Sequence, residues 1–156
     1  MIIDITKGSE NPILRKKSAK HGKVTKKTLK LLKDMEDSMI ATKGVGIAAP
    51  QIGINTRVAH ITIGKKRLTF PMINPVILER SEETNVETEG CLSLPKKWGP
   101  VERSNWVVAK FTTERGEEWV LRFEDFEARI VQHEVDHLNG TLFIDHVPEG
   151  KLETGK

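Results

Sequence analysis

The sequence predicts a single α+β domain in which antiparallel or mixed strands pack around a central helix. Helical periodicity occurs twice, near residues 25–42 and near residues 125–138, and the segments between them alternate as strands do. A helix, a run of strands and a second helix differ from the repeated βαβ order that builds a parallel sheet. The chain of 156 residues suits one domain with its own core, and it contains no internal repeat or linker-like tract.

The first helix is expected to start after Thr25, whose hydroxyl can cap it, and to end near Thr42. Its apolar residues recur at helical spacing, namely Leu29, Leu32, Met35, Met39 and Ile40. Lys26 and Lys27 oppose the positive end of the helix dipole, so this start carries an electrostatic cost. Residues 44–53 follow and are too rich in glycine for a helix.

Four segments between the helices read as strands because β-branched and aromatic residues alternate in them. They are 57–63, 72–78, 105–112 and 119–124. The last two are separated by Glu114-Arg115-Gly116-Glu117, which is typical of a hairpin connection.

The second helix is expected to be capped by Asp125 and to end at Asn139-Gly140, because glycine tolerates the left-handed conformation that follows a helix. One face carries Phe126, Ile130, His133, His137 and Leu138. The histidines make this helix the centre of interest in the predicted fold.

The composition is that of an ordinary globular protein, with 37% hydrophobic and 30% charged residues. Nothing approaches the roughly 18 consecutive apolar residues of a membrane span, so no membrane partner is expected. The first residues show neither the charged nor the apolar region of a signal peptide. Cys91 is the only cysteine, which leaves it without a disulfide partner and favours a cytoplasmic location.

Positive charge is concentrated at the start of the chain. Residues 1–33 contain ten Lys or Arg against Asp4 and Glu10, a net charge of +8, whereas the whole chain carries +3. Such a segment can favour RNA or another polyanion. A solvated, lysine-rich helix face and loop is the simpler explanation, and the absence of tyrosine with few other aromatic residues gives no stacking platform for single-stranded nucleic acid.

The sharpest motif is His133-Glu134-Val135-Asp136-His137 on the second helix. Residues four apart lie one turn above another on the same face, so the two imidazoles can take two corners of a tetrahedral metal site. Glu134 can then reach a water on the metal as a general base. The motif also occurs by chance, so ordinary surface or core histidines remain an alternative on this motif alone.

A third metal ligand is needed, and the sequence offers few candidates. Metzincin proteases place a histidine where this chain has Phe143, which cannot bind metal. Glu149 and Glu153 remain downstream, in a segment with little hydrophobic pattern. Cys91 is the natural upstream candidate, although a lone cysteine is more often a small buried hydrophobe.

Three blocks of the sequence together resemble the three motifs of peptide deformylases. They are Gly44-Val45-Gly46-Ile47-Ala48-Ala49-Pro50-Gln51, Glu89-Gly90-Cys91-Leu92-Ser93-Leu94-Pro95 and Gln132-His133-Glu134-Val135-Asp136-His137-Leu138. Their order and approximate spacing match, as does the opening Asn11-Pro12-Ile13-Leu14-Arg15, so the resemblance extends to about Phe143.

The resemblance implies a metal-dependent hydrolase that removes the N-formyl group from the initiator methionine of nascent peptides and releases formate. It implies Cys91, His133 and His137 as metal ligands and Glu134 as general base and acid. It further implies that Gln51 and the backbone N–H of Leu92 stabilise the oxyanion. The residues it implies around the methionine side chain or the peptide backbone are Val45, Gly46, Phe126, Ile130 and His133.

The metal itself is not determined by the residues. One thiolate and two imidazoles suit zinc, iron, cobalt or nickel. The resemblance implies one divalent ion, Fe(II), with zinc a less active substitute. Two other classes stay open as alternatives: a metallopeptidase or related amidase, and a non-catalytic relative that binds the ribosome or RNA.

The chain departs from the family pattern in two places. Glu127 stands where an apolar residue is usual. Many bacterial relatives also continue into a C-terminal helix that in some docks on the ribosome, whereas residues 148–156 are short and polar. We therefore expect a catalytic domain over residues 1–147, a polar tail over 148–156, and any docking on the ribosome through the basic first 33 residues.

Overall fold

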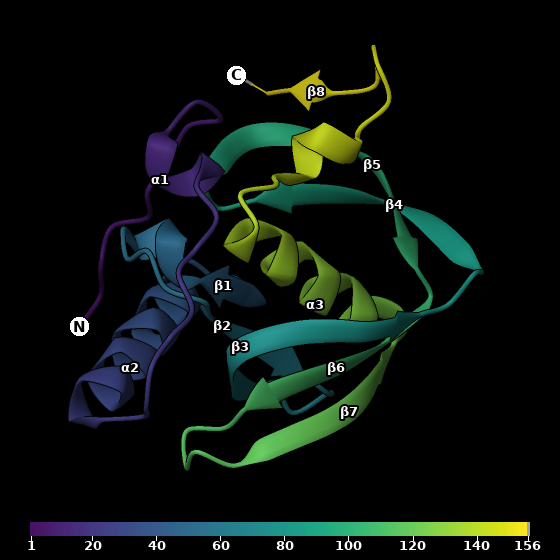
Figure 1. Cartoon of the computed structure of the whole chain (residues 1–156). Helices are drawn as coiled ribbons and strands as arrows, with labels where there is room; N and C mark the ends of the chain where they lie inside the picture. Colours follow the sequence, from purple (N-terminus) through teal and green to yellow (C-terminus); the bar gives the residue numbers. More distant parts are fainter. Residues whose placement is uncertain (156) are drawn as a thin grey trace.

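A helix, α3 (Asp125–Leu138), lies at the centre of the molecule between two antiparallel sheets (Figure 1). The computed structural model describes residues 1–155. The larger sheet has the strand order β1-β2-β3-β6-β7, and the smaller one has the order β4-β5-β8. The predicted α+β class, with strands packed around one central helix, is confirmed.

The larger sheet comprises β1 (Gly46–Ala48), β2 (Val58–Ile63), β3 (Leu68–Arg80), β6 (Trp106–Thr112) and β7 (Glu118–Glu124). The smaller sheet comprises β4 (Thr84–Cys91), β5 (Leu94–Ser104) and β8 (Glu153–Thr154). The remaining elements are α1 (Pro12–Arg15), α2 (Lys26–Ala41) and two 3-10 turns, η1 (Ala49–Ile52) and η2 (Phe143–His146). In the described part of the chain, no helix is both long and apolar enough to cross a membrane.

Helix α2 starts where the sequence predicts, because Thr25 Oγ1 accepts a hydrogen bond from the Thr28 N–H and Thr28 Oγ1 accepts one from the Thr25 N–H. Its buried apolar side chains include Leu32, Met35 and Met39. The other two residues assigned to that face were placed wrongly: Leu29 is 47% and Ile40 58% exposed. The buried apolar face of α2 is therefore narrower than the spacing of apolar residues in the sequence predicts.

Helices α2 and α3 pack against opposite faces of the larger sheet, as the alternation along β2 shows. Val58 belongs to the cluster formed with α2, whereas Ile61 belongs to the cluster formed with α3. Helix α3 is covered on one side by the larger sheet and on the other by β5.

Helix α3 begins one residue earlier than predicted. Asp125 is its first residue and not its cap; Glu124 takes the cap position without a side-chain hydrogen bond. Asp125 has a positive φ of 54°, and its N–H donates to the Asn105 carbonyl, so the bend between β5 and β6 fixes this start. The predicted end is confirmed by Gly140, whose φ is 76°.

The β4–β5 hairpin was missed from the sequence, although it carries the cysteine. Its register runs from Thr84 opposite Ser104 to Cys91 opposite Leu94, with an irregularity before Cys91. The expected hairpin between β6 and β7 is confirmed, since Thr113 N–H donates to Glu117 carbonyl at the turn. The expected strand at 72–78 is the middle of the longer β3.

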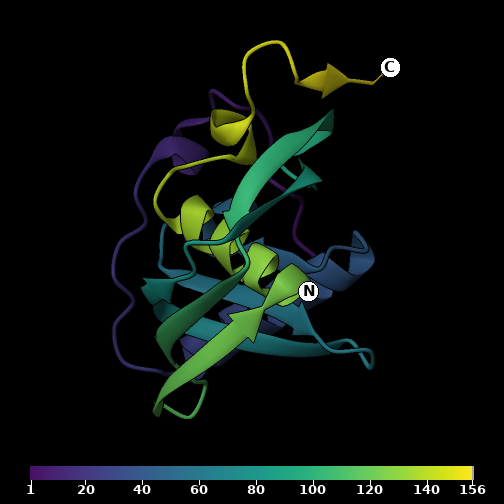
Figure 2. The ribbon, with the colours of Figure 1, turned by 90° about the vertical axis from the view of Figure 1, so that its right-hand side faces the viewer.

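The segment after residue 147 is not wholly irregular. Glu153 and Thr154 form β8, which pairs with Trp98 and Lys97 on β5 near the C-terminal end of the described chain (Figures 1 and 2). The boundary between a catalytic domain and a tail at residue 147 stays a prediction.

Candidate metal centre and substrate pocket

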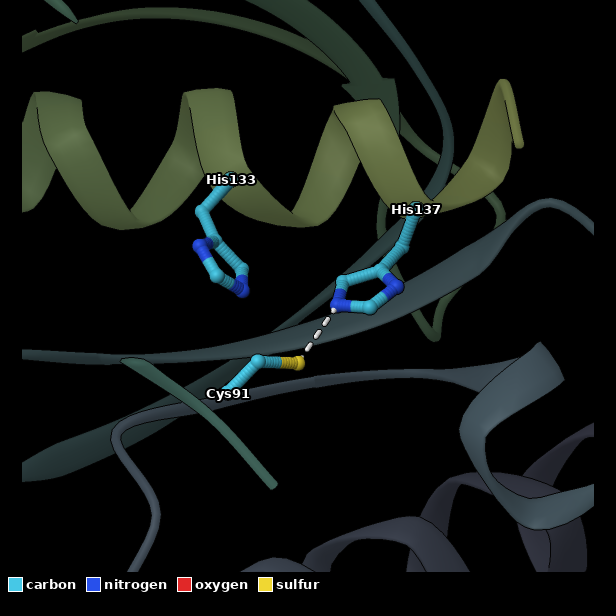
Figure 3. A group of neighbouring side chains, drawn as sticks. All are labelled: Cys91, His133 and His137. Atoms are coloured by element: carbon cyan, nitrogen blue, oxygen red, sulfur yellow. Dashed lines mark hydrogen bonds between the residues drawn. The ribbon is translucent and has the colours of Figure 1, made fainter. Parts of the chain in front are cut away.

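Three side chains from two distant parts of the chain converge beside α3 (Figure 3). Cys91 is the last residue of β4, and His133 and His137 lie one turn apart on α3. Their candidate ligand atoms all lie within 4.8 Å of one another, and Cys91 Sγ is 3.2 Å from His137 Nε2. The structure therefore brings together all three residues predicted to bind metal.

The orientation of His133 is fixed by a buried carboxylate. Its Nδ1 lies 2.9 Å from Glu89 Oε1. Burial raises the pKa of Glu89, but hydrogen bonds from His133 and Arg103 hold this pKa well below its usual range, so the carboxylate is ionised and only accepts. Nδ1 must then carry the proton, which leaves the Nε2 lone pair of His133 for a metal.

Two arginines hold Glu89 in turn. Arg103 donates from Nε to Oε2 and from Nη2 to Oε1, each at 2.9 Å, and Arg129 donates from Nη1 to Oε2 at 2.6 Å. Arg103 Nη1 also donates to Asp136 Oδ2 at 2.6 Å. Sequence reasoning missed these roles. Only the presence of Glu89 and Asp136 inside the two motifs hinted at them, because the arginines lie 14 and 40 residues from Glu89.

The surroundings of Cys91 favour its thiolate form. Burial raises the pKa of Cys91, but interactions with His137 and His133 outweigh it and hold the pKa well below its ordinary value. The thiolate is the form that binds metal. Cys91 is half-buried, and no second cysteine exists to form a disulfide with it.

Glu134 lies beside the cluster and against the chain of β1. It is buried, its Oε1 has no hydrogen-bond partner, and burial raises its pKa above the usual value. A Cβ added at Gly46 would collide with Glu134 Oε2. The resemblance places Gly46 beside the substrate, and the structure shows that its lack of a side chain also makes room for the Glu134 carboxylate.

Gln51 is held by η1 with its amide nitrogen turned toward the cysteine. Its Oε1 accepts from the Ala48 N–H at 2.9 Å, which leaves Nε2 3.2 Å from Ser93 Oγ and 3.7 Å from Cys91 Sγ. Leu92 occupies the turn between β4 and β5 directly after Cys91. Both predicted oxyanion donors thus lie next to the three candidate metal ligands, Cys91, His133 and His137.

The residues present suit a divalent transition metal. A thiolate with two imidazoles is a common donor set for a catalytic ion that keeps one position open. The buried, unpartnered Glu134 oxygen is consistent with a site that admits water next to the ligands. The downstream alternatives do not contribute to this cluster: Phe143 is buried, and Glu149 and Glu153 are exposed.

A cavity of about 860 Å³ opens onto the cluster. All five residues expected around the substrate line it, namely Val45, Gly46, Phe126, Ile130 and His133, and Phe126 is 61% exposed. Its wall also contains the polar residues Asn85, Asn105 and Arg129, which the sequence did not single out. Glu127, which stands where an apolar residue is usual in the family, does not line this cavity. Its carboxylate accepts a hydrogen bond from the Gly64 N–H at 2.9 Å.

A cysteine and two helical histidines beside a buried glutamate, on a small α+β domain, define the class of mononuclear metallohydrolases. A family profile described as Polypeptide deformylase matches residues 3–153. A peptide deformylase of Pseudothermotoga lettingae is 46% identical over 90% of this chain and 81% of its own length. Peptide deformylase 1 of Clostridium acetobutylicum is 48% identical over 89% of this chain and 91% of its own length. The chain belongs to the polypeptide deformylase family.

Solved structures of the family have the same fold. A peptide deformylase from Thermotoga maritima superposes with a TM-score of 0.90 at 38% identity, covering 95% of this chain and 99% of that one. A class I type b peptide deformylase from Acinetobacter baumannii, bound to Met-Ala-Ser, gives 0.89 at 37% identity over 94% and 99%.

Proposed function

We propose that this chain removes the N-formyl group from the initiator methionine of nascent peptides, releasing formate, at the Cys91–His133–His137 centre. The convergence of these three donors beside Glu134, in a chain of the deformylase family, carries the proposal. The Acinetobacter relative bound to Met-Ala-Ser supports a methionine-led peptide as the substrate class. The reaction is hydrolysis of a linear amide.

Each residue has a task in this reaction. A divalent ion held by Cys91, His133 and His137 would lower the pKa of the attacking water toward about 7. Glu134 takes the proton of the attacking water and returns it to the departing amine, and its raised pKa suits both steps. Gln51 Nε2 and the Leu92 N–H face the oxygen on which charge develops. A donor of this kind contributes typically ~2.7–4 kcal/mol to the barrier.

The substrate is positioned by the cavity. Val45, Phe126 and Ile130 provide the apolar part of its wall, which suits a methionine side chain. Gly46 allows the peptide backbone to approach β1 closely. The metal we propose is Fe(II), with zinc, nickel or cobalt as substitutes; anaerobic purification followed by metal analysis tests this choice.

Two substitutions test the assigned roles. Cys91→Ala should sharply lower metal content, because it removes one of three donors. Glu134→Gln should keep the metal and lose roughly 10²–10⁴ in turnover, because Glu134 moves a proton and does not coordinate. Full metal occupancy in the first variant, or near wild-type formate release by the second, would overturn these roles. A metallopeptidase would tolerate Cys91→Ala better than His133→Ala.

We also place the enzyme in the cytoplasm, where formylated nascent chains emerge. The exposed lysines between α1 and α2 support docking on ribosomal RNA. Lys16, Lys17, Lys20 and Lys23 are all exposed, and none forms a salt bridge within residues 1–155.

A further inference from the structure

Arg129 belongs at once to the substrate cavity and to the support of a metal ligand. It lies on α3 one turn before His133, and it lines the cavity beside Ile130. Its side chain is only 6% exposed. A buried arginine in the wall of a cavity for an apolar side chain needs a physical reason, because burying a charge is costly unless it is fully paired.

The guanidinium is bound on both sides. Nη1 donates to Glu89 Oε2 at 2.6 Å and to the Val101 carbonyl at 2.9 Å. Nη2 donates to the carbonyl and the side-chain oxygen of Asn85. Asn85 is fixed in turn, since its Nδ2 donates to Asn105 Oδ1 at 2.7 Å. Arg129 is thus held between a strand of the smaller sheet and the carboxylate that orients His133.

Charge balance explains why a second arginine is required. Arg103 is shared between the buried carboxylate of Glu89 and the half-buried carboxylate of Asp136. A buried carboxylate is costly unless both of its oxygens are paired with donors. Without Arg129, Glu89 Oε2 would keep only the Nε donor of Arg103, and the carboxylate that accepts from His133 Nδ1 would be held by one arginine alone. Arg129 supplies the missing positive charge.

We infer that Arg129 is a positioning residue that holds Glu89, and through it His133, in the metal-binding orientation from within the wall of the substrate cavity. This inference rests on the proposed metal role of His133. It adds that Arg129 links the wall of the substrate cavity to the metal ligand His133 through Glu89.

The test is the rate at which holoenzyme loses metal to a chelator in the absence of substrate. Partners that orient a metal-ligating histidine typically account for 10–100-fold in affinity. We therefore expect Arg129→Met to lose metal roughly 10–100-fold faster than wild type. Arg129→Lys, which retains the charge but not the two-sided binding, should lie between the two. The Nδ1–H signal of His133 in 15N-edited NMR should broaden or shift in Arg129→Met.

Two controls separate positioning from simple contact with substrate. Arg122→Met removes an exposed arginine paired with Glu124 and should leave metal loss and turnover unchanged. Phe126→Ala alters the cavity without touching the arginine network, and should raise KM while metal loss stays at the wild-type rate.

If Arg129→Met does not fold, Asn85→Ala takes its place, since it removes one acceptor of Nη2 and should speed metal loss about 10-fold. The inference fails if the folded variant at either position loses metal at the wild-type rate, even if its KM changes. A wild-type protein that binds no metal at all would instead contradict the proposed function.

Discussion

Gly46 and Glu134 show how a single hydrogen in place of a side chain shapes the site. Glu134 comes from α3 and Gly46 from β1, and the carboxylate packs where a Cβ would otherwise stand. The Glu134 carboxylate, which we propose as the general base, therefore has room only because residue 46 carries no side chain.

Gly46→Ala should displace the Glu134 carboxylate and reduce formate release by roughly 10²–10⁴, the usual contribution of a general acid–base group. Metal content should stay at the wild-type level, because none of the three donors is touched. Gly22→Ala is the matched control, since a Cβ there meets nothing within 4 Å. Equal turnover of the two variants would show that Glu134 is not held in this way.

Candidate site residues could be predicted from the sequence where they lie close together along the chain. His133, Glu134 and His137 share one turn of helix, and the lone Cys91 supplied the missing donor. Glu89, Arg103 and Arg129 were missed because their pairing depends on two strands and a helix meeting in space. A buried arginine in a sequence looks the same as an exposed one.

At the level of elements, the end of α3 is fixed by its contact with α1. Gly140 combines a φ of 76° with a position against the Arg15 carbonyl, where a Cβ would collide. The Arg15 side chain also reaches Asp145 Oδ2 at 2.6 Å, so the turn after α3 is tied to the start of the chain.

Gly140→Ala should lower the free energy of unfolding by more than the ~1–3 kcal/mol expected for a strained left-handed residue, because the collision with Arg15 adds to it. Gly150→Ala is the control, since Gly150 has a φ of 81° but open space around it. Denaturant unfolding of both variants measures the difference. An equal loss in the two variants would mean that the α1 contact relaxes without cost.

The packing of α2 on β2 contains a titratable group. His60 Nε2 donates to the Leu32 carbonyl at 3.0 Å, and its buried Nδ1 has no partner. Burial lowers the pKa of His60 below its ordinary value of 6.5. Below pH 6.5 the unfolded chain therefore takes up a proton that the folded chain does not. The free energy of unfolding consequently decreases as the pH is lowered.

His60→Gln retains a donor for the Leu32 carbonyl but does not titrate. Its free energy of unfolding should fall less steeply than that of wild type between about pH 7 and pH 5, the range in which histidine titrates. Parallel curves for the two proteins would show that folding does not lower the pKa of His60.

Elements with regular periodicity were predicted well, including α2, α3 and the β6–β7 hairpin. The β4–β5 hairpin was not, because Gly90, Pro95 and Gly99 interrupt any alternation. Gly99 has a packing reason that no sequence pattern reveals: a Cβ there would lie 2.8 Å from the Val147 side chain.

At the level of the whole molecule, charge is distributed unevenly. The basic segment that links α1 to α2 runs along the outside of the molecule (Figure 2). It is pinned by a bridge between Ala19 and Thr56 and by the His21 N–H, which donates to Asn74 Oδ1 at 2.8 Å. Its lysines are thus displayed from a fixed backbone.

Binding to ribosomes through these lysines should weaken steeply between roughly 50 and 200 mM salt, because phosphate contacts release counterions. Changing Lys16, Lys17, Lys20 and Lys23 to Glu should abolish co-sedimentation with ribosomes. A variant lacking residues 148–156 is the comparison. Loss of binding in that variant, with binding intact after charge reversal, would place the docking element at the C-terminal end.

The central claim is hydrolysis of a formyl group by a metal held at Cys91, His133 and His137. The most direct measurement is formate release from formyl-Met-Ala-Ser by anaerobically purified enzyme, with the peptide products identified by mass. We predict one formate for each peptide consumed and intact Met-Ala-Ser as the other product. Cleavage at a peptide bond, or no formate from protein that holds one metal per chain, would contradict the account.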